Sequence, residues 1–205
     1  MAELILIRHG KTAGNLLGRY IGSRTDEPLC DEGREGLAGK QLPEVERLYV
    51  SPMKRCVETA EILWPGFDRK KMQKVTDLRE CDFGDFENKN YKELSGNGDY
   101  QAWIDSNGTL PFPNGESMDA FKSRCLEAFA RIVEEVSEAE QEWIASGKTG
   151  IFRAGIVVHG GTIMAILEQY GYPKAAYFDY QVKNGCGYRL TPVEGTRLWN
   201  CLCLQ

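Results

Sequence analysis

The chain has few histidines and no long hydrophobic run. Only two of its 205 residues are histidine, and the first apolar stretch, residues 4–7, follows an acidic residue and ends at Arg8. A stretch this short cannot act as a signal peptide or cross a bilayer, which takes about 20 apolar residues. We therefore expect a protein that is not exported, remains cytoplasmic and has no membrane partner.

Cysteine pairing motifs are also missing. The seven cysteines are an odd number, and none forms a Cys-x-x-Cys pair. This usage argues against a disulfide framework and against a zinc site built from such pairs. We expect reduced thiols that pack as small apolar groups, with no resident metal and no other cofactor.

An excess of basic residues is absent as well. The 30 acidic and 25 basic side chains give a net charge of -5. Nucleic acids and anionic membranes attract basic surfaces, so neither is expected as a partner. A small anionic metabolite would have to be held by a local group of positive side chains, and the sequence is compatible with a homodimer.

The chain has enough apolar residues for one core. At 42% hydrophobic residues it is predicted to form a single domain over residues 1–205. Short β-rich runs alternate with helical segments, which is typical of an α/β layered domain. The predicted elements are buried strands at 4–7, 47–50 and 156–158, helices ending near Leu63 and Tyr170, an amphipathic helix from Ser117 to Trp143, and a hairpin over 186–204.

Residues 84–116 differ from the rest of the chain. They are polar, contain Gly, Asn and Pro, and carry Tyr91, Tyr100, Trp103 and Phe112. This segment could form a cap over a ligand site. It could equally be a surface excursion held in place by its own aromatic side chains.

Both histidines occur in the same local context. His9 and His159 each end a predicted buried strand, and each is followed directly by glycine. Random placement would produce both pairs about once in a hundred sequences of this composition. Open α/β sheets bind ligands beyond the carboxyl ends of their strands. We therefore predict a functional pair of imidazoles, although each alone could be a hydrogen-bonded core residue.

Several short motifs resemble those of the histidine phosphatase superfamily, which includes the cofactor-dependent phosphoglycerate mutases. In chain order they are Arg8-His9-Gly10-Lys11-Thr12 with Asn15, Tyr20-Ile21-Gly22, Ser51-Pro52-x-x-Arg55, Leu78-x-Glu80 and His159-Gly160-Gly161. They follow the order of the family, and they extend over most of the chain. The resemblance implies a three-layer sandwich, with a mainly parallel central sheet flanked by helices and a small inserted cap at 84–116.

The resemblance also implies a metal-independent phosphoric monoester hydrolase. Its catalytic residues would be His9, Glu80, His159, Arg8 and Arg55. The phosphate or substrate contacts would be Arg8, Asn15, Ile21, Gly22, Arg55, His159 and Gly160. Asn15 could instead stabilise a turn, and Lys11 stands where the family more often has an acidic or amide residue, which leaves its role open.

The chemistry of these side chains supports the assignment. Arg8 and Arg55 offer planar, permanently charged donors that suit phosphate oxygens. A neutral His9 can attack phosphorus, provided that some acceptor fixes its tautomer, and His159 is expected to be the protonated partner that stabilises the transition state. A carboxyl group in a partly dry site, Glu80, can protonate the leaving group.

The substrate class is open at this stage. Trp103, residues 113–117 and residues 182–186 resemble the α-ribazole 5′-phosphate phosphatases of cobalamin biosynthesis. The alternatives are a broad-specificity sugar or nucleotide phosphatase, a phosphoglycerate mutase, or a catalytically silent phosphate sensor. A remote alternative from another class is a non-haem iron protein with His9, His159 and Glu80 as ligands, which the neighbouring arginines disfavour.

Overall fold

A seven-stranded sheet forms the centre of the computed structural model, which describes residues 2–205. The strand order is β3-β2-β4-β1-β6-β7-β5, and four of the six pairings are parallel. The strands are β1 Glu3–Arg8, β2 Arg47–Val50, β3 Gln73–Lys74, β4 Arg153–Val158, β5 Gly171–Tyr172, β6 Gly187–Pro192 and β7 Trp199–Leu204. The predicted α/β class with a mainly parallel sheet is confirmed.

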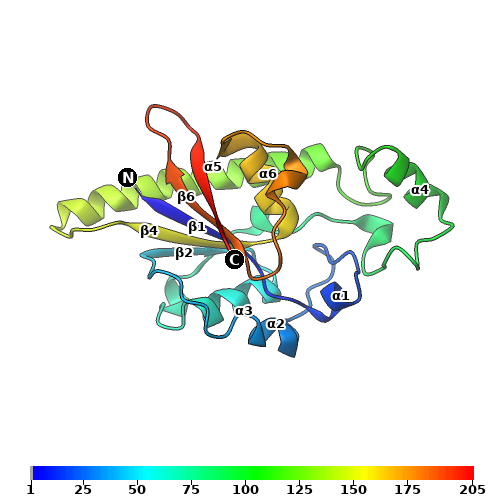
Figure 1. Ribbon diagram of the computed structural model, residues 1–205, viewed down its shortest axis with the longest axis horizontal. Helices are drawn as coiled ribbons and strands as arrows, with labels where there is room; N and C mark the ends of the chain where they lie inside the picture. The colour runs from blue at the N-terminus through cyan, green and yellow to red at the C-terminus, as the bar shows by residue number, and fades with distance from the viewer. Residues whose placement is uncertain (1) are drawn as a thin grey trace.

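Helices cover both faces of this sheet. They are α1 Ala13–Leu16, α2 Asp31–Glu35, α3 Lys54–Leu63, α4 Gly98–Asp105, α5 Met118–Ala145 and α6 Gly160–Tyr170. Figure 1 shows α5 and α6 on one side of the sheet and α2 and α3 on the other, so the predicted three layers are present. Within residues 2–205, no helix combines the length and the apolar character that crossing a bilayer requires.

The central position of β1 explains its unbroken apolar run. Leu4 and Leu6 point into the core cluster that includes side chains of α5 and α6. Ile5 and Ile7 point the other way, into the cluster that contains the buried side chains of α3. Alternate side chains of a strand face opposite sides of a sheet, so a strand between two helical layers needs apolar residues at every position.

The long helix α5 begins as its sequence predicts. The Ser117 hydroxyl accepts a hydrogen bond from the N–H of Ala120, which caps the first turn. Residues spaced by three and four, including Phe121, Phe129 and Val136, are buried along one face. The C-terminal hairpin is also confirmed, with β6 and β7 antiparallel and each strand beginning slightly later than predicted.

The segment 84–116 contains the short helix α4 and packs through aromatic rings. Phe86, Tyr100, Trp103 and Phe112 contact one another with ring centroids 5.2 to 6.2 Å apart. Tyr20 joins this cluster from the N-terminal part of the chain. In Figure 1, α4 lies at one end of the molecule, beyond the sheet. The segment is therefore anchored by its own aromatic side chains.

Candidate active site

The pairing of β1 with β4 brings the two histidines together. These parallel strands are in register with Arg8 beside Val158, so the residue that follows each strand is a histidine. The N–H of His9 donates to the carbonyl of Val158 (2.9 Å), and the two imidazole centroids are 5.2 Å apart. Both rings are buried. The predicted pair therefore lies at the carboxyl ends of two central strands, where α/β sheets bind ligands.

The His9 imidazole is held in one tautomer. Its Nδ1 lies 2.7 Å from the carbonyl oxygen of Gly10, which can only accept, so Nδ1 carries the proton and Nε2 keeps a free lone pair. Burial lowers the pKa of His9 well below its usual value, and the nearby Arg55 and Arg8 lower it further. The ring is neutral at pH 7. The acceptor that the sequence could not identify is thus a backbone carbonyl.

The two predicted arginines lie beside the histidines. Arg55, in the first turn of α3, is fully buried, and its guanidinium donates to the carbonyls of Thr25 (2.8 Å) and Gly22 (3.0 Å). Arg8 donates to the carbonyl of Val182 (2.7 Å). Each arginine also has a buried Nε–H for which residues 2–205 provide no acceptor. Both therefore retain hydrogen-bonding capacity for an anion.

Glu80 reaches the site from the segment before the predicted cap. Its carboxylate accepts hydrogen bonds from the N–H groups of Cys81 (3.0 Å) and Gly161. A Cβ atom at Gly161 would come within 2.8 Å of the carboxylate, so glycine permits this close approach. Burial raises the pKa of Glu80, although Cys81, Arg55, Arg8 and Gly161 oppose the rise. A raised pKa keeps a carboxyl group protonated to higher pH than usual.

Arg124 of α5 holds the Glu80 segment in place. Its guanidinium makes two hydrogen bonds of 2.7 Å to the Glu116 carboxylate, and both side chains are mostly buried. It also donates to the carbonyls of Asp77, Arg79 and Glu80 at 2.7 to 3.0 Å. One arginine therefore ties three carbonyls of the acid-bearing segment to the long helix.

Replacement of Arg124 by alanine is expected to reduce the free energy of unfolding by about 3 kcal/mol, because it leaves Glu116 and three carbonyls without their donor. Arg131→Ala is the matched control on the same helix. It removes a solvent-exposed pair with Asp77 and should cost less than about 1 kcal/mol. Urea denaturation of both variants measures the difference, and equal losses would contradict the clamping role.

His159 differs from His9 in its contacts. It precedes α6, and its Nε2 lies 2.7 Å from the hydroxyl of Ser51 and 3.6 Å from the thiol of Cys56. Burial raises the pKa of Cys56 to about 12, so this neighbour is a neutral thiol. Burial, Arg55, His9 and Arg8 lower the pKa of His159 well below its usual value. In the protein without a bound anion, burial and then the neighbouring positive charges therefore disfavour the imidazolium form of His159, and its expected protonation during the reaction stays a prediction.

The other residues predicted to contact phosphate or substrate make different kinds of contact in the structure. The Oδ1 of Asn15 accepts from the Thr12 N–H and completes a capping box at α1, which agrees with the turn-stabilising alternative. Ile21 is buried, and its carbonyl, like that of Gly22, faces Arg55. The N–H of Gly22 donates to Glu87. Gly160 begins α6, whose N-terminus has no side-chain cap, which suits its N–H to an anion.

Two residues near His9 had no assigned role from the sequence. The Nδ2 of Asn184 lies 3.1 Å from the His9 carbonyl and 3.2 Å from the Oδ1 of Asn15. The Thr59 hydroxyl accepts from the N–H of Gly10 at 2.9 Å. Asn184 lies within the stretch 182–186 that the sequence singled out, but its contact across 175 positions depends on the antiparallel pairing of β6 with β1. No local pattern could indicate it.

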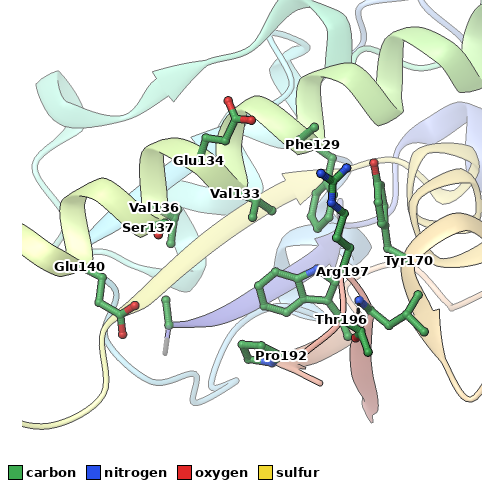
Figure 2. A pocket seen from close by; sticks show the side chains of 14 residues that line it. Phe129, Val133, Glu134, Val136, Ser137, Glu140, Tyr170, Pro192, Thr196 and Arg197 are labelled. Carbon is green, nitrogen blue, oxygen red and sulfur yellow. Dashed lines mark hydrogen bonds between the residues drawn. The ribbon is translucent and has the colours of Figure 1, made fainter. Parts of the chain in front are cut away.

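A separate apolar hollow lies away from these residues. It measures about 380 Å³ and is lined by residues 129–140 of α5, Tyr170 and the turn around Arg197. Figure 2 shows Phe129 and Val133 on its α5 side and Pro192 on the hairpin side. Ala2 and Trp199 place it at the amino end of β1 and the start of β7, opposite the histidines. It is not the candidate active site.

The ligand set proposed for iron is not assembled. Within residues 2–205, no three side chains from His, Cys, Asp and Glu are arranged to hold a metal ion. His9, His159 and Glu80 are instead engaged by Gly10, Ser51 and Cys81. The geometry therefore agrees with an anion site between two arginines rather than a cation site.

Comparison with known proteins places the chain in a family. It matches the histidine phosphatase superfamily (branch 1) over residues 4–203 and belongs to that superfamily. It is 30% identical to phosphoglycerate mutase-like protein 4 of Arabidopsis thaliana, over 82% of this chain and 70% of that protein. It is 28% identical to the adenosylcobalamin/alpha-ribazole phosphatase of Salmonella typhimurium, over 94% of this chain and 92% of that protein. The fold resembles the crystal structure of the alpha-ribazole phosphatase of Shigella flexneri with a TM-score of 0.74 at 24% identity, over 98% of this chain and 95% of that one.

Proposed function

We propose that the chain is a phosphatase that hydrolyses a small phosphomonoester through a phosphohistidine at His9. The observation that carries the proposal is a neutral imidazole whose Nδ1 is bonded to Gly10, beside Arg8 and Arg55. A free Nε2 lone pair is the form of histidine that can attack phosphorus. Membership of the histidine phosphatase superfamily supports the same reaction.

In the first step, the Nε2 of His9 attacks phosphorus in line, and the P–O bond to the leaving alcohol breaks. Arg8 and Arg55 hold the equatorial oxygens, and the N–H of Gly160 at the start of α6 adds a further donor. Because the Nε2 of His159 is engaged by Ser51, its Nδ1 is the nitrogen available to a phosphate oxygen. A bound phosphate dianion favours protonation of His159. The protonated ring can then take the cationic role that burial and the neighbouring arginines disfavour when no anion is bound.

Glu80 acts in both halves of the reaction. Its buried carboxyl group, with a raised pKa, gives its proton to the departing alkoxide. The resulting carboxylate then takes a proton from water as the water oxygen attacks the phosphohistidine. This second step releases phosphate, returns His9 to its neutral form and leaves Glu80 protonated again. No step needs a metal ion, because the arginines carry the positive charge.

The proposal is tested by trapping the intermediate. A brief reaction with a ³²P-labelled phosphomonoester, stopped in alkali, should label the protein with an adduct that is stable to base and lost in acid. Peptide mapping should place the label on the peptide that contains His9. If turnover occurs but no labelled intermediate is found, with sampling times short enough to resolve a burst of product, the mechanism is contradicted.

We further propose α-ribazole 5′-phosphate as the substrate. The support is the similarity to the Salmonella phosphatase along nearly the whole chain. Tyr100 and Trp103 of the segment 84–116, together with Tyr20, also offer flat surfaces for an aromatic base. The value of kcat/KM for this ester should exceed that for p-nitrophenyl phosphate by at least about tenfold. Equal values would favour the broad-specificity alternative.

The same proposal includes the setting of the enzyme. We regard residues 1–205 as one domain, with the segment 84–116 as a cap over the leaving-group side of the site, and we place the enzyme in the cytoplasm. Its partner would be a small phosphorylated metabolite. Analytical ultracentrifugation distinguishes a monomer from the homodimer that the sequence allows.

A further inference from the structure

A basic hollow lies next to the candidate active site. It measures about 520 Å³ and lies between the loop before β6 and the region of Lys11 and α2. The residues that line it are Arg8, Lys11, Gly36, Lys40, Gln181, Val182, Lys183, Asn184 and Cys186. Four of them are cationic, and none carries a carboxylate. In a chain with a net charge of -5, this local excess of positive charge needs an explanation.

Most of these cations are not neutralised by the protein. Of the four cations that line the hollow, only Lys11 forms an ion pair with a carboxylate among residues 2–205, and its partner is Glu32. Lys40 has only a thiol contact, to Cys186 at 4.0 Å, and Lys183 is exposed. Arg8 donates to the carbonyl of Val182. Like charges that share a hollow repel one another, so an anion placed among them is strongly favoured.

The wall of the hollow is joined to the predicted nucleophile. The N–H of Gly185 lies 3.0 Å from the Arg8 carbonyl and 3.1 Å from the His9 carbonyl. The amide of Asn184 is within 3.4 Å of the Gly10 carbonyl, which is the group that fixes the His9 tautomer. Arg8 itself belongs both to the hollow and to the proposed phosphate pocket. An anion in the hollow would therefore act on the active site at close range.

We propose that this basic hollow is a second anion site that binds a free phosphate dianion. The inference rests on the proposed function, because phosphate is the second product of that reaction. A phosphate held by Lys40 and Lys183, beside Arg8, offsets the positive charge that draws a substrate into the site. The consequence is inhibition by product through a site separate from the one where product is formed.

The experiment uses Lys40→Ser/Lys183→Ser, with Lys70→Ser/Lys71→Ser as a control that removes the same charge from exposed lysines elsewhere. Isothermal titration calorimetry with inorganic phosphate at low salt should show two phosphate-binding sites in the wild type and in the control. The test variant should lose one site or bind it at least about tenfold more weakly. Inhibition of p-nitrophenyl phosphate turnover by phosphate should lose its non-competitive component in the test variant alone.

A second experiment tests which anion occupies the hollow: free phosphate, or the second phosphoryl group of a bisphosphate substrate. An alkanediol bisphosphate is compared with its monophosphate by kcat/KM. A wild-type preference for the bisphosphate that disappears in the test variant would support the anion site but overturn its assignment to free phosphate. Identical behaviour of the two double variants in both experiments would overturn the site itself. If the wild type hydrolyses no phosphomonoester, the proposed function fails, while the titration still decides whether the second site exists.

Discussion

Replacement of His9 by alanine is expected to lower kcat by about 10⁴-fold or more and to abolish the phosphoenzyme. The expected size follows from the loss of the nucleophile itself, since removal of a nucleophile leaves only the contribution of binding and electrostatics. Arg8, Arg55 and His159 remain in the variant, so a phosphate ester should still bind. Single-turnover kinetics with a labelled ester measure both effects.

The composition of the chain sharpens this test. With only two histidines, any phosphohistidine that persists in His9→Ala must lie on His159 and would reverse the proposed roles. His159→Ala is the matched variant, because it also removes a buried imidazole from the end of a central strand. It should slow the reaction yet retain a label on His9. Thermal unfolding of both variants separates a chemical loss from a loss of folded protein.

Replacement of Glu80 by glutamine is expected to have an effect that depends on the leaving group. An alkoxide needs a proton as it departs, and the loss of a positioned acid costs roughly 10²–10⁴-fold. A nitrophenolate departs without protonation, so the first step with p-nitrophenyl phosphate should slow by less than about tenfold. Burst kinetics measure that step apart from the hydrolysis of the phosphoenzyme. Equal losses for alkyl and aryl esters would remove Glu80 as the proton donor.

The pH dependence of the wild type should reflect the protonation states of Glu80 and His9. The pKa of Glu80 is raised, chiefly by burial, so its protonated form persists above the usual range for a carboxyl group and is lost as pH rises through that pKa. The pKa of His9 is lowered, again chiefly by burial, so the imidazole remains neutral as pH falls below its usual value. Activity toward alkyl esters should therefore be highest in mildly acidic solution. Glu80→Gln should lose the decline at higher pH for these esters, because the group that titrates there is gone.

Much of the fold and most of the candidate site could be predicted from the sequence. The strand before His9 is buried on both faces, and that requirement shows directly as an unbroken apolar run. The strand before His159 has the same pattern, and adjacent parallel strands end at the same edge of a sheet. The periodicity of α5 and its cap at Ser117 are likewise local features. Signals of this kind need no knowledge of distant contacts.

The parts that could not be predicted depend on contacts between distant segments. The strands β3 and β5 have two residues each, and their pairing is set by neighbours rather than by their own sequence. The clamp from Arg124 to the Glu80 segment spans more than 40 positions. The pKa of His159 is lowered because folding buries the ring and places it near Arg55, His9 and Arg8. Motif order indicates which residues are used, but not their protonation states.

The antiparallel pairing of β6 with β1 has a consequence for synthesis of the protein. Residue 9 is synthesised well before Asn184, Gly185 and the strand that holds them beside it, because about 175 residues separate them in the chain. A nascent chain therefore displays the arginine–histidine motif without the surroundings that orient it. Contacts this distant in sequence also form slowly. The arginine–histidine motif therefore acquires the backbone contacts that surround it only after the segment that contains β6 has been made and has paired with β1.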